Sequence, residues 1–173
     1  MNQSYIVTAS GGFFNFEEPE SSVFTIKDVA HALAHTCRFN GRTRDFYSVA
    51  QHSYMVSYIV PEQYALQGLL HDAAEAFIGD VTTPLKRLLP DYKALEKRIE
   101  AVVLGAFGIS PDLHASVKEA DLIMLATEKR FLMPPTAENW PILEGVRPLD
   151  HLSPWDSHTG YAHFMARYLE LTK

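Results

Sequence analysis

Apolar residues recur at helical spacing along most of this chain, and this periodicity constrains the fold more than any other feature. In the segment TIKDVAHALAHTC (25–37), Ile26, Val29 and Leu33 would share one face of a helix. Signals typical of β-strands are nearly absent beyond the first 16 residues. The sequence therefore predicts an all-α fold.

The ends of the predicted helices are marked by capping residues, prolines and glycines. Thr25 and Asp28 resemble a capping box at the start of the first helix. Thr83 is the predicted N-cap, and Pro84 the first helical position, of a helix interrupted near Pro90. The predicted helices cover the segments 25–37, 46–60, 62–78, 83–106, 110–133 and 154–171.

The length of 173 residues predicts one domain that can bury a full hydrophobic core. Residues 1–24, with YIVTASGGFFNF alternating around two glycines, are expected to form an N-terminal β-hairpin or arm. Residues 25–133 would form the helical core, and residues 134–173 an irregular segment and a C-terminal helix. That amphipathic last helix would cover either the core or a neighbouring subunit.

Composition excludes several classes of protein. The net charge of −6 argues against a surface for a nucleic-acid polymer. No apolar run approaches the ~18 residues of a membrane-spanning helix, and the first residues do not resemble a signal peptide, so a cytoplasmic location is expected. A single cysteine, Cys37, excludes an intramolecular disulfide and a zinc site with several thiolates.

Ionisable residues interrupt the apolar segment LLHDAAEAFIGD (69–80). His71 and Glu75 would share one helical face, while Asp72 would project ~100° away from it. A lone His71 would be read as a hydrogen-bonded core histidine. An imidazole buried with several carboxylates is costly, however, and a divalent cation would offset that cost. The combination of His71, Asp72, Glu75 and Asp80 therefore favours a metal site.

Two further side chains complete a set of metal ligands. His52 lies on the apolar face of the segment 46–60, and Asp121 lies beside the buried stripe of the segment 110–133. With His71 and Asp72 they would supply two imidazoles and two carboxylates from three helices. One or two ligand positions would remain for water.

The ordered set His52, His71–Asp72 and Asp121 resembles the signature of the HD-domain metal-dependent phosphohydrolases. HDAAEAFIGDVTTPLK is similar to the corresponding segment of bacterial HD-domain 5′-deoxynucleotidases. TASGGFFNF, IKDVAHALAHTCRFNG and FYSVAQHS resemble small bacterial and phage HD hydrolases. The resemblance covers roughly residues 5–133.

This resemblance implies an HD-domain helical bundle that binds one divalent ion through His52, His71, Asp72 and Asp121. Manganese, cobalt, zinc, iron and magnesium all suit such ligands. Only His114 lies between the His-Asp pair and Asp121, which favours one ion. A second Mg²⁺ carried by a polyphosphate substrate stays open.

The resemblance also implies roles for other residues. Glu75 would orient or deprotonate the attacking water, and Asp80 would protonate the departing sugar oxygen. Arg38 would grip the phosphate, and Lys86 would add positive charge nearby. For the base, Phe39 would supply an aromatic contact, and Pro84 would form the other wall of the base-binding slot. The sequence departs from the family pattern here, because Phe39 stands where those enzymes carry Trp and its spacing to His52 is about one residue shorter.

We therefore expect a phosphohydrolase that cleaves the 5′ phosphoester of deoxynucleoside mono- or triphosphates. Its partners would be a small-molecule nucleotide and further copies of the chain in a homo-oligomer. The alternative is a non-catalytic HD module that binds a nucleotide or metal and regulates a partner.

Two other patterns receive a structural interpretation. His31 and His35 have the spacing of zincin ligands, but Ala32 replaces the general-base glutamate. We expect His31 to pack near the site or to support a ligand. Glu128 and Arg130 are expected to form an ion pair within the helix or at a subunit interface.

Overall fold

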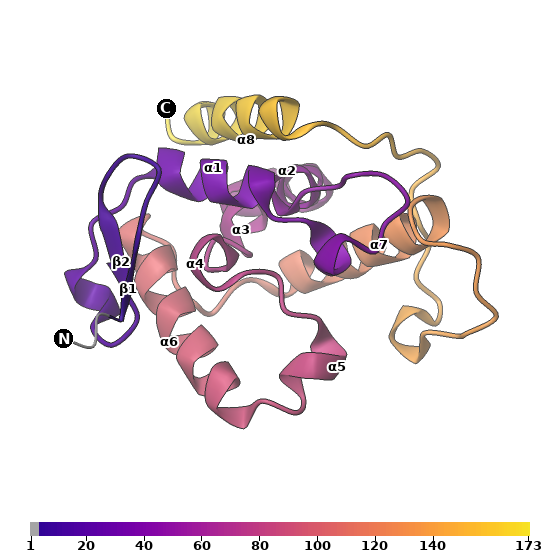
Figure 1. The fold of residues 1–173 in the computed structure, drawn as a ribbon. Helices are drawn as coiled ribbons and strands as arrows, with labels where there is room; N and C mark the ends of the chain where they lie inside the picture. Colours follow the sequence, from indigo (N-terminus) through magenta and orange to yellow (C-terminus); the bar gives the residue numbers. More distant parts are fainter. Residues whose placement is uncertain (1–3) are drawn as a thin grey trace.

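Helices form most of residues 4–173, the part of the chain that this computed structural model describes. The mostly helical class predicted from the sequence is confirmed, whereas the HD fold and the single domain remain predictions. The α-helices are α1 (Ile26–His35), α2 (Val49–Ile59), α3 (Ala65–Leu70), α4 (Glu75–Ile78), α5 (Thr83–Lys86), α6 (Pro90–Ala106), α7 (Ala115–Phe131) and α8 (Ser157–Leu171) (Figure 1). The short 3₁₀ helices are η1 (Pro19–Ser21), η2 (Arg38–Gly41), η3 (Glu62–Tyr64) and η4 (Pro141–Leu143).

The predicted N-terminal hairpin is present. Strands β1 (Tyr5–Val7) and β2 (Phe13–Asn15) pair antiparallel, with Ile6 opposite Phe14. Phe14 is fully buried and stacks on Phe77 of α4, with ring centroids 4.0 Å apart. The hairpin is therefore packed against the helices that carry the core.

Helix α1 starts at the predicted capping box. The Thr25 hydroxyl accepts a hydrogen bond from the Asp28 N–H, and the Asp28 carboxylate accepts one from the Thr25 N–H at 2.8 Å. Asp28 also accepts hydrogen bonds from the backbone N–H and the hydroxyl of Ser10, at 2.7 and 2.9 Å. One buried carboxylate thus joins the hairpin turn to the start of α1.

Helix α8 covers the core of its own chain. It lies alongside α1 in Figure 1, and Phe164 on its inner face is fully buried. Tyr161, Tyr168 and Leu171 pack against the same buried cluster. Of the two alternatives left by the sequence, the described residues favour coverage of the core.

Helices α2 and α3 approach each other at Gly68. A Cβ atom at this position would lie 3.1 Å from the Cα of Ser57 and 3.3 Å from its backbone nitrogen. Only glycine allows this approach without a shift of one helix against the other. The contact fixes the relative position of His52 on α2 and His71 just after α3.

Three predicted helix boundaries are wrong. The segment 62–78 is divided into η3, α3 and α4, because the chain between α3 and α4 makes tight turns rather than a continuous α-helix. The N-cap of α5 is Thr82, so Thr83 is the first helical residue. Helix α7 begins only after His114, whose side chain accepts a hydrogen bond from the Ser116 N–H. The predicted break at Pro90 is confirmed, since α6 starts there.

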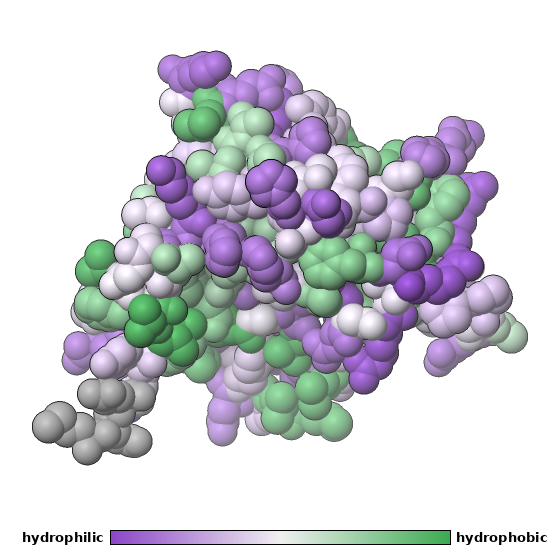
Figure 2. All heavy atoms as spheres, turned by 45° about the horizontal axis from the view of Figure 1, so that its top comes forward, coloured by the Kyte–Doolittle hydropathy of each residue, from purple (hydrophilic) through white to green (hydrophobic). Residues whose placement is uncertain are grey.

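Polar and apolar residues are interspersed on the face of the molecule shown in Figure 2. Among residues 4–173, no helix combines the length and the apolar character that crossing a membrane requires.

Candidate metal centre and active site

Three segments of the chain bring His52, His71 and Asp72 together and place Asp121 against His52. The Nε2 atom of His52 on α2 lies 3.3 Å from Nε2 of His71 and 3.4 Å from Oδ1 of Asp121 on α7. The Oδ2 atom of Asp72 lies 3.6 Å from His52 Nε2 and 3.2 Å from His71 Nε2. Ligands bound at about 2.1 Å to one ion lie roughly 3.0–3.4 Å apart, so these spacings suit a shared cation.

Both imidazoles are held by an acceptor on the ring nitrogen that faces away from this cluster. His71 Nδ1 lies 2.8 Å from the carbonyl oxygen of Gly68, and His52 Nδ1 lies 2.6 Å from Oε1 of Glu128. A carbonyl oxygen can only accept, so Nδ1 of His71 carries the proton of this contact. Such an outer acceptor is the usual support of a metal-ligating histidine.

The chain makes tight turns after α3. Ala73 N–H donates to Leu70 O at 2.9 Å, and Glu75 N–H donates to Asp72 O at 3.0 Å, both spanning three residues. Successive residues in such turns still project in different directions, so His71 and Asp72 meet through the ends of their side chains, with Nε2 and Oδ2 3.2 Å apart.

Glu128 is the residue of this site that the sequence interpretation missed. It is fully buried, bonds His52 Nδ1, and lies 3.2 Å from Nη2 of Arg38. The predicted ion pair within the helix is not formed, since Glu128 pairs with Arg38 and Arg130 lies over the ring of Phe131, whereas the pair at a subunit interface stays a prediction. The available signal was the spacing from Asp121, because residues seven apart share a helical face.

Arg38 is surrounded by carboxylates. Its Nη1 atom lies 3.7 Å from Asp72 and 3.7 Å from Asp80, in addition to the contact with Glu128. Burial alone would lower the pKa of the guanidinium, but Glu128, Asp72 and Asp80 raise it well above its ordinary value. The buried Nε atom has no hydrogen-bond partner within residues 4–173, so one donor of Arg38 is free for a ligand.

Glu75, the first residue of α4, is buried with one oxygen free. Its Oε2 atom makes no hydrogen bond to the described part of the chain. Burial, together with the charges of Asp72 and Asp80, raises the pKa of Glu75 well above its ordinary value. The same surroundings therefore favour uptake of a proton by Glu75.

The charges of the cluster favour a cation at its centre. For Asp72, burial opposes ionisation, but His71, His52 and Arg38 hold its pKa below the ordinary value. For His52, burial and Arg38 act to lower the pKa, and Glu128 and Asp121 outweigh them and raise it to about 9. In the metal-free protein, the carboxylates of Glu128 and Asp121 therefore stabilise a proton on His52. A bound cation would supply the positive charge in place of this proton.

Two nitrogen and two oxygen donors fit a transition-metal ion such as zinc, manganese, cobalt or iron. The side chains of Asp72 and Asp121 are 20% and 24% exposed, which allows water to reach the cluster. The three ligands His52, His71 and Asp72 offer atoms within 4.8 Å of one another.

Asp80 and Phe39 meet beside this cluster. The Phe39 N–H donates a hydrogen bond to Oδ2 of Asp80 at 3.2 Å. Phe39 and Asn40 both have a left-handed backbone, with φ values of 54° and 52°. Non-glycine residues in this region are uncommon and concentrate at functional sites.

The two α5 residues predicted to contact substrate lie further from the ligands. Lys86 forms an ion pair with Glu96 of α6, so its charge is partly compensated. Pro84 is exposed in the first turn of α5. No contact joins either residue to the four candidate ligands in the described part of the chain.

His31 and His35 lie outside the site. Both are exposed, their ring centroids are 4.4 Å apart, and His35 Nδ1 lies 2.8 Å from the His31 carbonyl oxygen. The expectation that His31 supports a ligand is therefore wrong.

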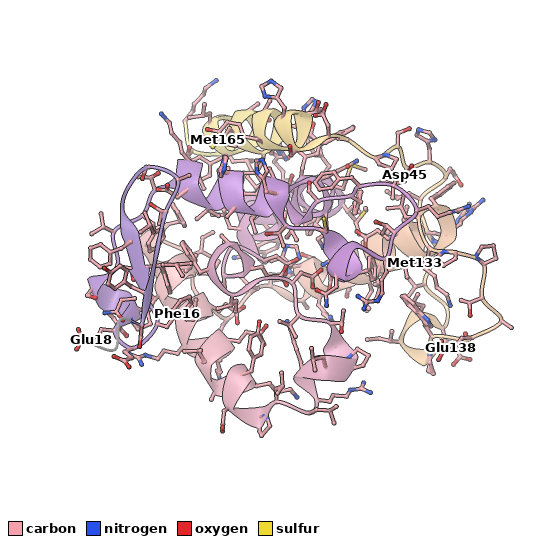
Figure 3. All side chains as sticks on the ribbon, in the orientation of Figure 1. Phe16, Glu18, Asp45, Met133, Glu138 and Met165 are labelled. Atoms are coloured by element: carbon pink, nitrogen blue, oxygen red, sulfur yellow. The ribbon has the colours of Figure 1, made fainter. Side chains whose placement is uncertain are left out.

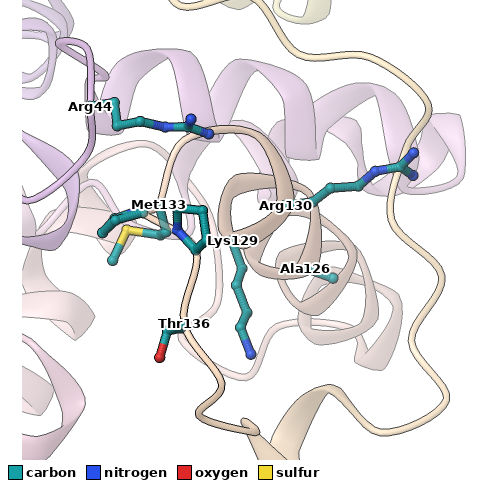
Figure 4. Close-up of a pocket in the computed structure, with 8 residues that line it drawn as sticks. Arg44, Ala126, Lys129, Arg130, Met133 and Thr136 are labelled. Atoms are coloured by element: carbon teal, nitrogen blue, oxygen red, sulfur yellow. The ribbon is translucent and has the colours of Figure 1, made fainter.

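A separate cavity of about 310 Å³ lies at the C-terminal end of α7 (Figure 4). Arg44, Lys129 and Arg130 contribute positive charge to its lining, together with Met133 and Thr136. Arg44 donates to the carbonyl oxygen of Phe131 at 3.0 Å, which is a usual role for a cation at a helix C-terminus. The cavity contains none of the candidate metal ligands.

Comparison with known proteins places the chain in a family. No protein-family model matches it. It is 42% identical over 172 residues to the uncharacterized protein YfdR of Escherichia coli, covering 98% of this chain and 97% of YfdR. An uncharacterized protein of Rhodobacter capsulatus is 35% identical over 130 residues, which are 69% of this chain and 66% of that protein. A 5′-deoxynucleotidase of Pasteurella multocida is 28% identical over 122 residues, 60% of this chain and 55% of the enzyme. The chain therefore belongs to the same family as YfdR, and its distant relatives include proteins named 5′-deoxynucleotidases.

Proposed function

We propose that this protein is a metal-dependent phosphohydrolase of deoxynucleoside 5′-phosphates. The observation that carries the proposal is the cluster of His52, His71 and Asp72, with ligand atoms 3.2–3.6 Å apart, and Asp121 lies 3.4 Å from His52 Nε2. The similarity to 5′-deoxynucleotidases supports the class of substrate.

His52, His71, Asp72 and Asp121 would hold one divalent cation. When bound, such an ion lowers the pKa of water and polarises a phosphoryl oxygen. A second Mg²⁺ would enter only with a polyphosphate substrate.

Glu75 would accept a proton from the attacking water. Its unpartnered Oε2 atom is available for this bond, and burial with the charges of Asp72 and Asp80 raises its pKa, which makes the carboxylate a stronger base. The new bond joins the water oxygen to phosphorus, and the bond between phosphorus and the 5′ oxygen breaks. Asp80, placed beside Arg38, would return a proton to that 5′ oxygen.

Arg38 would bind the phosphate through its free Nε donor. The three carboxylates around it keep the guanidinium charged and fixed, so little side-chain freedom is lost on binding. Phe39 would contact the base. Lys86 and Pro84 would take part only if α5 moved closer to the cluster.

The first experiment is to incubate the purified protein with Mn²⁺, Co²⁺, Zn²⁺, Fe²⁺ or Mg²⁺ and a panel of deoxynucleoside mono- and triphosphates. Release of inorganic phosphate indicates a monophosphatase, and release of triphosphate indicates a triphosphohydrolase. Binding of nucleotide or metal without turnover would instead favour the non-catalytic regulatory module.

Variants of the cluster test the assignment of residues. Asp72→Ala should abolish metal binding, whereas Asp112→Ala, at an exposed position, should leave it unchanged. Glu75→Ala should keep the metal but lower kcat by ~10²-fold or more, the scale of a lost general base. Full turnover in the presence of a chelator, or an unaffected Glu75→Ala variant, would contradict the mechanism.

A further inference from the structure

A second aromatic ring faces Phe39 from a distant part of the chain. Trp140, which directly precedes η4, has its ring centroid 6.3 Å from that of Phe39, with the two planes inclined by 45°. Both residues are partly exposed. Figure 3 labels Met133 and Glu138, which lie on the segment that leads from the end of α7 to Trp140.

The Phe39 ring is held in place from the catalytic side. Its N–H is bonded to Asp80, and the guanidinium carbon of Arg38 lies 5.4 Å from its ring centroid. Nη1 of Arg42 lies 3.3 Å from the carbonyl oxygen of Asn40 and also reaches that of Phe39. These contacts stabilise the left-handed backbone that directs Phe39 toward Trp140.

Trp140 is linked in turn to α7. The Lys129 ammonium lies 4.8 Å from the Trp140 ring centroid and donates a hydrogen bond to the carbonyl oxygen of Glu138 at 3.1 Å. Helix α7 also carries Asp121 and Glu128, so Trp140 is linked through Lys129 to the helix that supplies part of the candidate metal centre. The distance between the Phe39 and Trp140 rings thus depends on the position of Arg38, the proposed phosphate-binding residue, which contacts Glu128 of the same helix.

The two rings contact each other directly. Stacked carbon atoms lie about 3.5 Å apart, so a planar base between two parallel rings requires about 7 Å. The observed centroid distance of 6.3 Å, with the planes inclined by 45°, is shorter than this, so a base would enter when the Trp140 ring turns parallel to Phe39 and its loop moves slightly outward.

We propose that Phe39 and Trp140 form a slot in which the nucleobase of the substrate stacks. This inference rests on the proposed function and adds Trp140 as a substrate-binding residue. Stacking uses the π-face that every base possesses, so the slot distinguishes nucleotides from plain sugar phosphates more than it distinguishes one base from another.

The test compares 2′-deoxyadenosine 5′-monophosphate with 2-deoxyribose 5-phosphate, which lacks a base. Loss of one stacking partner weakens base binding by about tenfold or more. Trp140→Ala should therefore lower the ratio of kcat/KM for the nucleotide to kcat/KM for the sugar phosphate by at least ~10-fold, mainly through KM. Trp140→Phe should restore most of the ratio. Ile142→Ala, at an exposed position of the same loop, is the matched control. An unchanged ratio in Trp140→Ala would refute the slot.

Fluorescence separates failure of the slot from failure of the proposed function. Trp140 and Trp155 are the two tryptophans of the chain, so a Trp155→Phe protein reports on Trp140 alone. Quenching by the nucleotide but not by the sugar phosphate supports the slot even if neither compound is hydrolysed. Equal quenching by both compounds, or none by the nucleotide at millimolar concentration, overturns it.

Discussion

Replacing Glu128 by glutamine would test how the candidate metal centre is supported. Glu128 is fully buried and joins two elements of the site, with Oε1 2.6 Å from His52 Nδ1 and Oε2 3.2 Å from Arg38 Nη2. Glutamine keeps the shape of the side chain but removes its charge and one of the two acceptors. One of the two bonds must therefore be lost, and the other is no longer charge-assisted.

The expected loss can be estimated from these two contacts. Removing the outer partner of a metal-ligating histidine lowers metal affinity by about 10–100-fold, which corresponds to about 1.4–2.7 kcal/mol. Hydrogen bonds to charged groups contribute about 1.5–3 kcal/mol each to stability. Because Arg38 keeps Asp72 and Asp80 at 3.7 Å, we expect the free energy of unfolding of the metal-free protein to fall by only about 2 kcal/mol.

Calorimetric titration with Co²⁺ measures the first quantity, and urea unfolding in chelator measures the second. Glu119→Gln removes the same charge from an exposed position of the same helix and should change neither. If Glu128→Gln bound Co²⁺ as tightly as the wild type, the orienting role of Glu128 would be refuted. Equal weakening in Glu119→Gln would show instead that only the net charge of α7 matters.

Three further predictions follow from particular contacts. Gly68→Ala should lower the free energy of unfolding by about 1–3 kcal/mol, because the added Cβ would press on Ser57. The control is Gly105→Ala, whose Cβ meets nothing within 4 Å and which should not lower the free energy of unfolding. Equal effects of the two substitutions in urea unfolding would contradict the close approach of α2 and α3. Asp28→Asn should cost about 1–2 kcal/mol at pH 7, because four hydrogen bonds to its carboxylate hold the pKa of Asp28 at about 2. That contribution is complete above about pH 4 and is lost as the pH falls through 2, so acid titration of stability should be flatter in the variant. Saturation with Mn²⁺ at 100 times its dissociation constant should stabilise the wild type by about 2.7 kcal/mol and leave Asp72→Ala unchanged in a thermal-shift assay.

The sequence predicted the helical class because the spacing of apolar residues can be read within each short segment, without knowledge of tertiary contacts. The capping box at Thr25 and Asp28 and the break at Pro90 were likewise readable from short-range chemistry. The division of the segment 62–78 was not readable, because its apolar and polar spacing fits a continuous helix. What interrupts it are the tight turns after α3, and these depend on the tertiary site.

The four candidate ligands were predicted from residue type and order, and the structure brings the donor atoms of His52, His71 and Asp72 together and places Asp121 beside His52. Glu128 was missed because a glutamate beside a lysine and an arginine on a helix resembles an exposed salt-bridge residue. Trp140 was missed for a different reason. It lies in an irregular, proline-rich segment, where sequence pattern gives no direction for a side chain, and its partner Phe39 is 101 residues away.

In the proposed function, Arg38 and Phe39 would let one short segment contact both ends of the substrate. In extended or helical backbone, adjacent side chains are directed by a regular geometry, but the positive φ of Phe39 breaks that regularity immediately after Arg38. The guanidinium can therefore lie among Asp72, Asp80 and Glu128 while the next ring faces Trp140. A change that relaxed this backbone would separate the phosphate contact from the base contact, so both kcat and KM would respond together. The strained pair Phe39–Asn40 is thus the point at which the metal centre and the proposed slot are mechanically connected.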